Sequence, residues 1–135
     1  MKAYQHKVQY YETDKMGITH HSNYIRWMEE ARIDFLEQLG WNYEKLEKAG
    51  IFSPVTAVTC KYKISTTFPD ILTITVSVVE FQGVTLKLKY EMKNADGKLV
   101  CEAYSEHCFL NAEGKLLRLQ KEHPAFYQVL LSLKA

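Results

Sequence analysis

Residues 12–32 read ETDKMGITHHSNYIRWMEEAR, and they join a crowded polar segment to the start of a long helix. Apolar residues then recur at steps of three and four, with charged residues between them, until Gly40 supplies a stop signal. The recurring positions are Tyr24, Met28, Ala31, Phe35 and Leu39. This spacing predicts an amphipathic helix over residues 23–39, with its apolar stripe facing a core.

Alternating apolar and polar residues flank this helix on both sides. The alternation predicts strands over residues 4–10, 58–64, 72–78, 84–92 and 98–110, and a short one over 115–119. Hairpin turn residues fill 94–97 and 111–114, and short connections of this kind make the joined strands antiparallel. Two more helices are expected, over residues 43–49 and from Pro124 onward.

One early helix followed by antiparallel strands is an α+β pattern. We expect one domain over residues 1–135, in which a curled antiparallel sheet of five to six strands wraps a long central helix. Such a sheet leaves an open edge, and pairing of two copies is a common way to cover it. A homodimer or homotetramer is therefore expected.

Composition excludes several classes of partner. The 17 Lys and Arg residues nearly balance the 16 Asp and Glu residues, so the chain carries no strong field that would attract nucleic acid. No apolar run is long enough for a membrane span or a signal peptide, so the expected location is the cytoplasm. The three cysteines show no CxxC spacing, which disfavours both a zinc site and a disulfide framework.

The polar segment holds candidate parts for acyl transfer. Asp14 lies in the loop before the helix and can act as a base or nucleophile. Gly17 lets the backbone pass close to a ligand. The first turn of the helix carries N–H groups without helical acceptors, which can hold an oxyanion.

A structural interpretation of the same residues competes with this one. Asp14 can simply cap a turn, and Thr19, Ser22 or Asn23 can cap the helix. If the Thr19 hydroxyl bonds the amides of the first turn, those amides are not available to a substrate. Spacing alone favours this interpretation.

Other chemistries find less support. His20 and His21 are adjacent, so on a helix they point in different directions, and neither HxxxH nor HExxH spacing is present; we expect no metal site. A nucleophilic serine in a GxSxG turn is absent. The lysines at 61, 63, 87 and 89 alternate along strands and are more typical of a solvated face than of a phosphate site.

The segment resembles the acyl-CoA thioesterases of the 4-hydroxybenzoyl-CoA thioesterase family, which have the hotdog fold. The residues that follow the family pattern, in order, are Tyr11, Glu12, Thr13, Asp14, Gly17, Ile18, His21, Asn23 and Tyr24, and the helix continues it with Trp27, Glu30, Ala31 and Arg32. The order of elements fits the whole chain. A departure lies at residues 64–70, where Pro69 stands in place of a glycine that many relatives carry.

This resemblance implies hydrolysis of an acyl-CoA thioester, or of an acyl-carrier-protein thioester, without a cofactor. It implies that Asp14 is the catalytic carboxylate and that the backbone N–H of His21 polarises the carbonyl. The implied substrate site also contains Gly17, Ile18, His20, Asn23 and Tyr24, of which Asn23 and Tyr24 support the turn. In such folds the site lies at a dimer interface.

Two alternatives remain open at this stage. A separate hotdog lineage places its catalytic acid on the helix, which here would be Glu30. A non-catalytic acyl-CoA or acyl-carrier binder would keep the pocket and the dimer but hydrolyse nothing. The sequence does not choose the acyl group.

Overall fold

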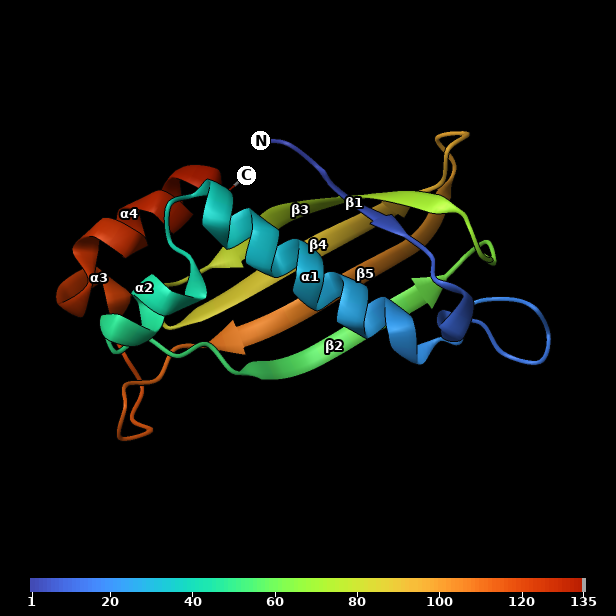
Figure 1. The fold of residues 1–135 in the computed structure, drawn as a ribbon. Coiled ribbons are helices and arrows are strands. Elements are labelled where there is room, and N and C mark those ends of the chain that lie inside the picture. The colour runs from blue at the N-terminus through green and yellow to red at the C-terminus, as the bar shows by residue number, and fades with distance from the viewer. Residues whose placement is uncertain (135) are drawn as a thin grey trace.

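The computed structural model describes residues 1–134, and in it one long helix lies across one face of an antiparallel sheet (Figure 1). The helix is α1 (Ser22–Gln38). The strands are β1 (Tyr4–Lys7), β2 (Val55–Tyr62), β3 (Ile71–Phe81), β4 (Thr85–Lys93) and β5 (Leu99–Cys108). They form one five-stranded sheet in the order β1-β3-β4-β5-β2, with every neighbouring pair antiparallel. The predicted α+β class and strand number are confirmed.

The smaller helices and the polar loop lie at opposite ends of the molecule. The helices α2 (Tyr43–Lys48), α3 (Leu119–Glu122) and α4 (Pro124–Leu133) gather at one end of the sheet, while residues 13–21 form the loop at the other end (Figure 1). A short 3-10 helix, η1 (Tyr10–Glu12), precedes that loop. Across residues 1–134, no helix combines the length and the apolar character that a membrane crossing requires.

The apolar stripe of α1 supplies the centre of the core, as its spacing predicts. Trp27, Met28 and Ala31 are at most 1% exposed, and Phe35 is also buried. They pack in one cluster with the inward-facing residues of the sheet, which include Leu72, Ile74, Leu88, Tyr90 and Met92. Burial of this stripe, rather than helix propensity, is the main source of the stability of such a helix.

Strand β2 differs from the other four. Its eight residues are exposed or half-buried, with no fully buried member, because it pairs only with β5 and its other edge is open. Val55 and Tyr62 are 45% and 47% exposed. An open strand edge with apolar side chains is an interaction surface that natural proteins normally cover.

Two strand predictions are wrong in extent or in kind. The first strand ends at Lys7 and not at Tyr10, because the chain bends into η1 and leaves Tyr10 exposed. The predicted strand over 115–119 is a single bridge between Leu110 and Leu116. Leu119 then starts α3, because burying its side chain beneath that helix outweighs continued pairing.

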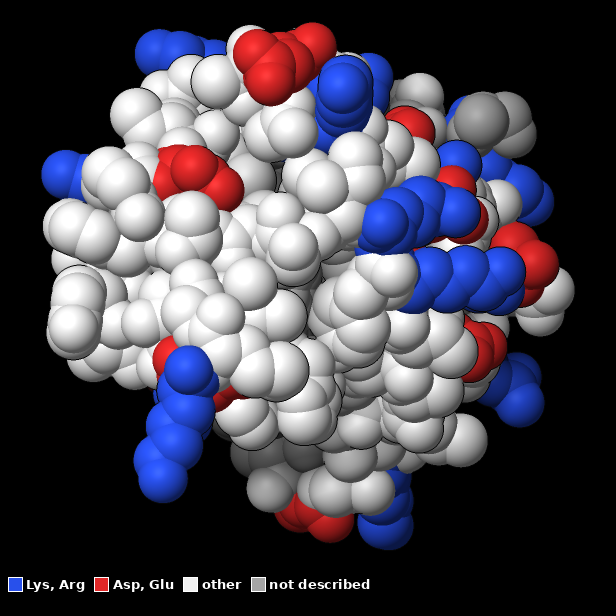
Figure 2. Space-filling model, turned by 90° about the vertical axis from the view of Figure 1, so that its right-hand side faces the viewer, with Lys and Arg blue, Asp and Glu red and all other residues white. Residues whose placement is uncertain are grey.

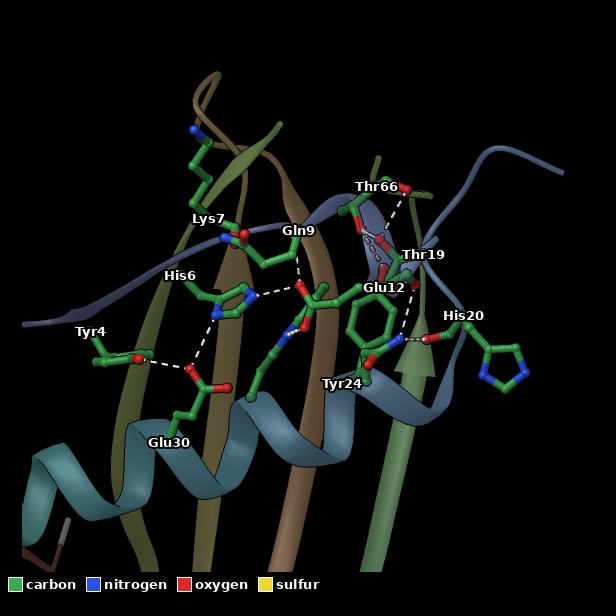
Figure 3. Close-up of polar contacts among 12 residues, drawn as sticks. Tyr4, His6, Lys7, Gln9, Glu12, Thr19, His20, Tyr24, Glu30 and Thr66 are labelled. Carbon is green, nitrogen blue, oxygen red and sulfur yellow. Dashed lines mark hydrogen bonds and ion pairs between the residues drawn. The ribbon is translucent and has the colours of Figure 1, made fainter. Parts of the chain in front are cut away.

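A buried carboxylate ties β1, η1 and α1 together. Glu12 is 5% exposed and accepts three hydrogen bonds: from the backbone N–H of Gln9 (2.8 Å), from His6 Nε2 (2.9 Å) and from Trp27 Nε1 (2.7 Å) (Figure 3). Burial by itself raises the pKa of Glu12, but the donors from Gln9, His6 and Trp27 outweigh it and hold the pKa below its ordinary value of 4.5. The ionised form is therefore the stable one.

We predict that Glu12→Gln lowers the free energy of unfolding by about 3 kcal/mol at pH 7, because an amide cannot accept all three of these bonds. The stabilisation by Glu12 is complete above about pH 4.5 and is lost as the pH falls through its lower folded-state pKa. Urea unfolding of both proteins between pH 3 and pH 7 tests this, with the exposed Glu29→Gln on the same helix as control. An equal loss of unfolding free energy in Glu12→Gln and Glu29→Gln would contradict the stabilising role of the Glu12 carboxylate.

Candidate active site

The loop after η1 holds Asp14 in a tight turn. The Asp14 N–H donates to Ile18 O at 2.9 Å, and the Gly17 N–H donates to Asp14 O at 2.9 Å. Gly17 has a φ of 78°, a left-handed conformation that favours glycine. One carboxylate oxygen of Asp14, Oδ1, accepts from the Met16 N–H at 2.8 Å. The predicted turn-capping role is thus real, but it occupies only one of the two oxygens.

A cluster of hydroxyl groups fixes this loop against the chain that leads into β3. Thr19 and Thr66 share a hydroxyl–hydroxyl hydrogen bond of 2.7 Å, and Tyr24 Oη shares one of 2.9 Å with Thr66 Oγ1 (Figure 3). The Thr19 N–H donates to Thr66 O at 2.8 Å, and Thr67 Oγ1 donates to Gly17 O at 2.6 Å. Thr66 is 2% exposed. These bonds hold residues 14–19 and 64–67 as one unit.

The N-terminus of α1 is not capped by any of the residues that sequence reasoning suggested. The Thr19 hydroxyl bonds Thr66, and Asn23 Nδ2 donates to Glu12 O and His20 O, so neither side chain reaches the amides of the first turn. The capping prediction for these two residues is wrong, because partners far along the chain or in the preceding loop bind them instead. Ser22 bonds the ring of His20.

This leaves one amide of the helix start unoccupied. Among residues 1–134, no acceptor lies in hydrogen-bond geometry with the His21 N–H, and His21 makes no side-chain cap. The amide sits at the positive end of the helix dipole of α1. It is therefore a donor that a developing negative charge can use.

A cleft of about 320 Å³ is lined in part by His21. Its walls are Asp14, Met16, Ile18, Thr19, His21 and Tyr24 from the loop and helix, and Tyr62, Lys63, Ile64 and Ser65 from the end of β2. Figure 2 shows this end of the molecule, where most of the visible surface is uncharged and Lys and Arg side chains lie at its edges and across its right-hand part. A mostly uncharged cleft with a few polar groups is typical of a small-molecule site.

The cleft brings together four of the seven predicted site residues. Asp14, Ile18, His21 and Tyr24 line it. Gly17 shapes the turn behind Asp14, the His20 ring stacks on His21 with centroids 4.4 Å apart, and the buried Asn23 supports the turn; none of these three is part of the cleft wall. Sequence reasoning missed the wall contributed by residues 62–65, which lie far from the motif along the chain.

Two phenols in the wall remain protonated at neutral pH. Burial raises the pKa of Tyr24, although its hydrogen bond to Thr66 opposes the shift. Burial and the nearby Cys60 raise the pKa of Tyr62 to about 12. The Tyr62 hydroxyl donates to His21 O at 3.3 Å, which connects the end of β2 to the start of α1.

Glu30 lies outside this cleft. Its Oε1 accepts from Tyr4 Oη at 2.7 Å and lies 3.1 Å from His6 Nδ1, so the side chain belongs to the hydrogen-bonded network around Glu12 (Figure 3). Burial and the Glu30 carboxylate raise the pKa of Tyr4 to about 12. Among residues 1–134, no group of three His, Cys, Asp or Glu side chains has the arrangement of a metal site.

An accessible carboxylate, a free helix amide and an open cleft on this fold are the parts of an acyl-transfer site. Residues 8–131 match the sequence profile of the thioesterase-like superfamily. The crystal structure of a DHNA-CoA thioesterase from Staphylococcus aureus superimposes with a TM-score of 0.91 at 32% identity, covering 97% of this chain and 89% of that chain.

Named relatives agree with this match. YneP of Bacillus subtilis (strain 168), provisionally named an acyl-CoA thioesterase, is 31% identical over 122 residues, which is 90% of this chain and 88% of that protein. The 4-hydroxybenzoyl-CoA thioesterase of Pseudomonas sp. (strain CBS-3) is 24% identical over 135 residues, covering 95% of each. The architecture is therefore the hotdog fold of thioester hydrolases. The chain belongs to the thioesterase-like superfamily, and the resemblance predicted from residues 11–32 is confirmed.

We predict that Thr66→Val lowers the free energy of unfolding by about 2 kcal/mol, because it leaves the buried Tyr24 hydroxyl without its partner and leaves the Thr19 hydroxyl only its bond to Thr66 O. Thr66→Ser keeps the hydroxyl and should recover most of the loss. Denaturant unfolding of the three proteins measures both effects. Equal stability of the Val variant and the native protein would show that the cluster does not hold the loop.

Proposed function

We propose that the enzyme hydrolyses acyl-CoA thioesters with Asp14 as the catalytic carboxylate and the His21 amide as the oxyanion donor. The observation that carries the proposal is that half-buried Asp14 and His21, whose N–H has no acceptor in residues 1–134, line one cleft. The names of the relatives, which specify CoA thioesters, support the substrate class.

The proposed chemistry needs few groups. The thioester carbonyl oxygen accepts from the His21 N–H, and negative charge develops on it next to the positive end of the α1 dipole. Asp14 either attacks the carbonyl carbon or removes a proton from the attacking water. The C–S bond then breaks, and where Asp14 is the nucleophile, water hydrolyses the resulting acyl-Asp14 anhydride to release the free acid and restore the carboxylate. A thiol with a pKa near 8.5 leaves as thiolate with little help from a general acid.

The proposed assembly is a homodimer formed through β2. The open edge of β2 carries exposed apolar side chains at both ends, Val55 and Tyr62, and Tyr62 also lines the cleft. Pairing of β2 with a second copy satisfies the edge and places the partner beside each cleft. A tetramer built from two such dimers is compatible with this arrangement.

Two further expectations belong to the proposal. The three free thiols, Cys60, Cys101 and Cys108, fit a reducing compartment, which supports a cytoplasmic location. An acyl-carrier-protein thioester would present the same carbonyl to the cleft as an acyl-CoA does. A non-catalytic binder is the competing function, and the unoccupied His21 amide favours catalysis over it.

We predict that Asp14→Asn lowers kcat at least about 100-fold, because an amide neither attacks the carbonyl nor accepts a proton. Its Oδ1 can still accept from the Met16 N–H, so the loop should keep its fold. Glu30→Gln should retain activity, since Glu30 does not line the cleft. The activity of the native protein and of both variants is measured as thiol release from short, long and aromatic acyl-CoA esters.

Loss of activity in Glu30→Gln but not in Asp14→Asn, with both variants folded, would move the catalytic acid to the helix. Binding of acyl-CoA without thiol release by the native protein would instead identify a binding protein. Circular dichroism spectra of both variants are the control for folding.

We also predict that Thr59→Glu, on the exposed part of β2, weakens the dimer and lowers activity in parallel, because it places like charges near one another across the paired edge. The exposed Thr75→Glu on the internal strand β3 is the matched control. Light scattering gives the mass, and thiol release gives the activity. A native chain that is active as a monomer would contradict the proposed assembly.

A further inference from the structure

A second cavity lies at the opposite end of the molecule from the cleft. It has a volume of about 20 Å³, enough for one water-sized group, and α1, α2, β4, β5 and α4 all contribute to its wall. Most of the lining is aliphatic or aromatic, including Leu36, Leu88 and Phe126. Two of the lining side chains, Arg32 and His107, can carry or share a positive charge.

A chain of hydrogen bonds connects these two side chains. Arg32 Nη1 donates to Tyr90 Oη at 2.9 Å, the Tyr90 and Ser105 hydroxyls are 2.7 Å apart, and Ser105 Oγ is 2.7 Å from His107 Nε2. Ser105 and His107 are at most 1% exposed. Their donors and acceptors therefore need partners within the protein, because bulk water does not reach them.

One arrangement of protons gives the Tyr90 and Ser105 hydroxyls an acceptor each. A guanidinium group can only donate, so Tyr90 accepts from Arg32 and passes its own proton to Ser105. Ser105 then donates to Nε2 of His107. Burial lowers the pKa of His107 to about 4, the Arg32 charge acts in the same direction, and the Ser53 backbone opposes both. The ring is therefore neutral at pH 7, and its one proton is on Nδ1.

This Nδ1–H donor is buried and has no hydrogen-bond partner in residues 1–134. The Ser53 backbone lies near the ring, but its geometry leaves Nδ1 unbonded. Arg32 is half-buried, and no carboxylate in residues 1–134 lies within ion-pair distance of it. The residues around the cavity thus include a buried donor without an acceptor and a half-buried positive charge that no carboxylate neutralises, and the unpaired donor is costly in an apolar surrounding.

We propose that this cavity is a binding site for a single halide ion, held between the His107 Nδ1–H and the Arg32 guanidinium. An anion accepts from both donors and neutralises the Arg32 charge. Water can accept from the same donors and give its protons to hydroxyls of the wall, but it carries no charge and leaves the Arg32 guanidinium unneutralised. The Tyr43 and Ser53 hydroxyls, also in the wall, can both turn to donate to an anion.

This cavity is separate from the cleft, and halide binding in it takes no part in thioester hydrolysis. Bound halide would stabilise the packing of α1 against the sheet at the end where α2 and α4 close the core, because it binds the folded chain and not the unfolded one.

Bromide tests the proposal directly, because its anomalous scattering distinguishes it from water. Crystals of the native protein grown in sodium bromide should show a bromine peak in the cavity, within hydrogen-bond distance of His107 Nδ1 and Arg32. A cavity that contains only water density, or no density, overturns the proposal. This experiment does not depend on any variant folding.

Thermal unfolding at constant ionic strength gives the matching measurement in solution. Replacing sodium gluconate, whose anion is too large for the cavity, by sodium bromide should raise the unfolding midpoint of the native protein by several degrees in a saturable way. Arg32→Met should lose this rise, while the exposed Arg26→Met on the same helix should keep it. An equal rise in all three proteins, or none in the native protein, contradicts a specific site.

Discussion

The ionised Glu12 side chain is the interaction on which the arrangement of this protein depends. It is buried, and its donors come from three successive parts of the chain: His6 on β1, Gln9 before η1 and Trp27 on α1. A buried carboxylate is tolerated only when its charge is fully hydrogen-bonded. The bonds therefore fix where α1 lies relative to β1, and with it the position of the loop that α1 follows.

The cleft is a consequence of this constraint together with the Thr66 cluster. Because Thr19 bonds Thr66 and Asn23 bonds the loop backbone, the residues that normally cap a helix are already engaged. The His21 N–H is left free at the end of a dipole. In this protein the hydrogen bonds that stabilise the loop also create the electrostatic feature on which the proposed catalysis depends.

Local patterns predicted the parts of the fold in which one face is buried. The periodicity of α1 and the alternation in β3 and β4 match their burial, because each contains a continuous apolar face. Residues 115–119 alternate as a strand would, but only one bridge forms there, because burial of Leu117 and Leu119 turns the chain toward α3. Periodicity reports which side chains are buried and not what they are buried against.

The site was only partly predictable for a related reason. The motif predicted Asp14 and His21, which are close in sequence and both line the cleft, but residues 62–65 of its wall and the Thr19–Thr66 bond involve positions more than forty residues away. The local sequence of the loop before α1 gives no sign that residues 62–66 lie against it, and the reverse is also true. The most direct test of the account is a crystal structure with an acyl-CoA analogue in which a methylene replaces the thioester sulfur. We expect its ketone oxygen to accept from the His21 N–H, with the ketone carbon facing Asp14. A ketone bound elsewhere in the cleft, with the His21 amide still unoccupied, would contradict the proposed mechanism.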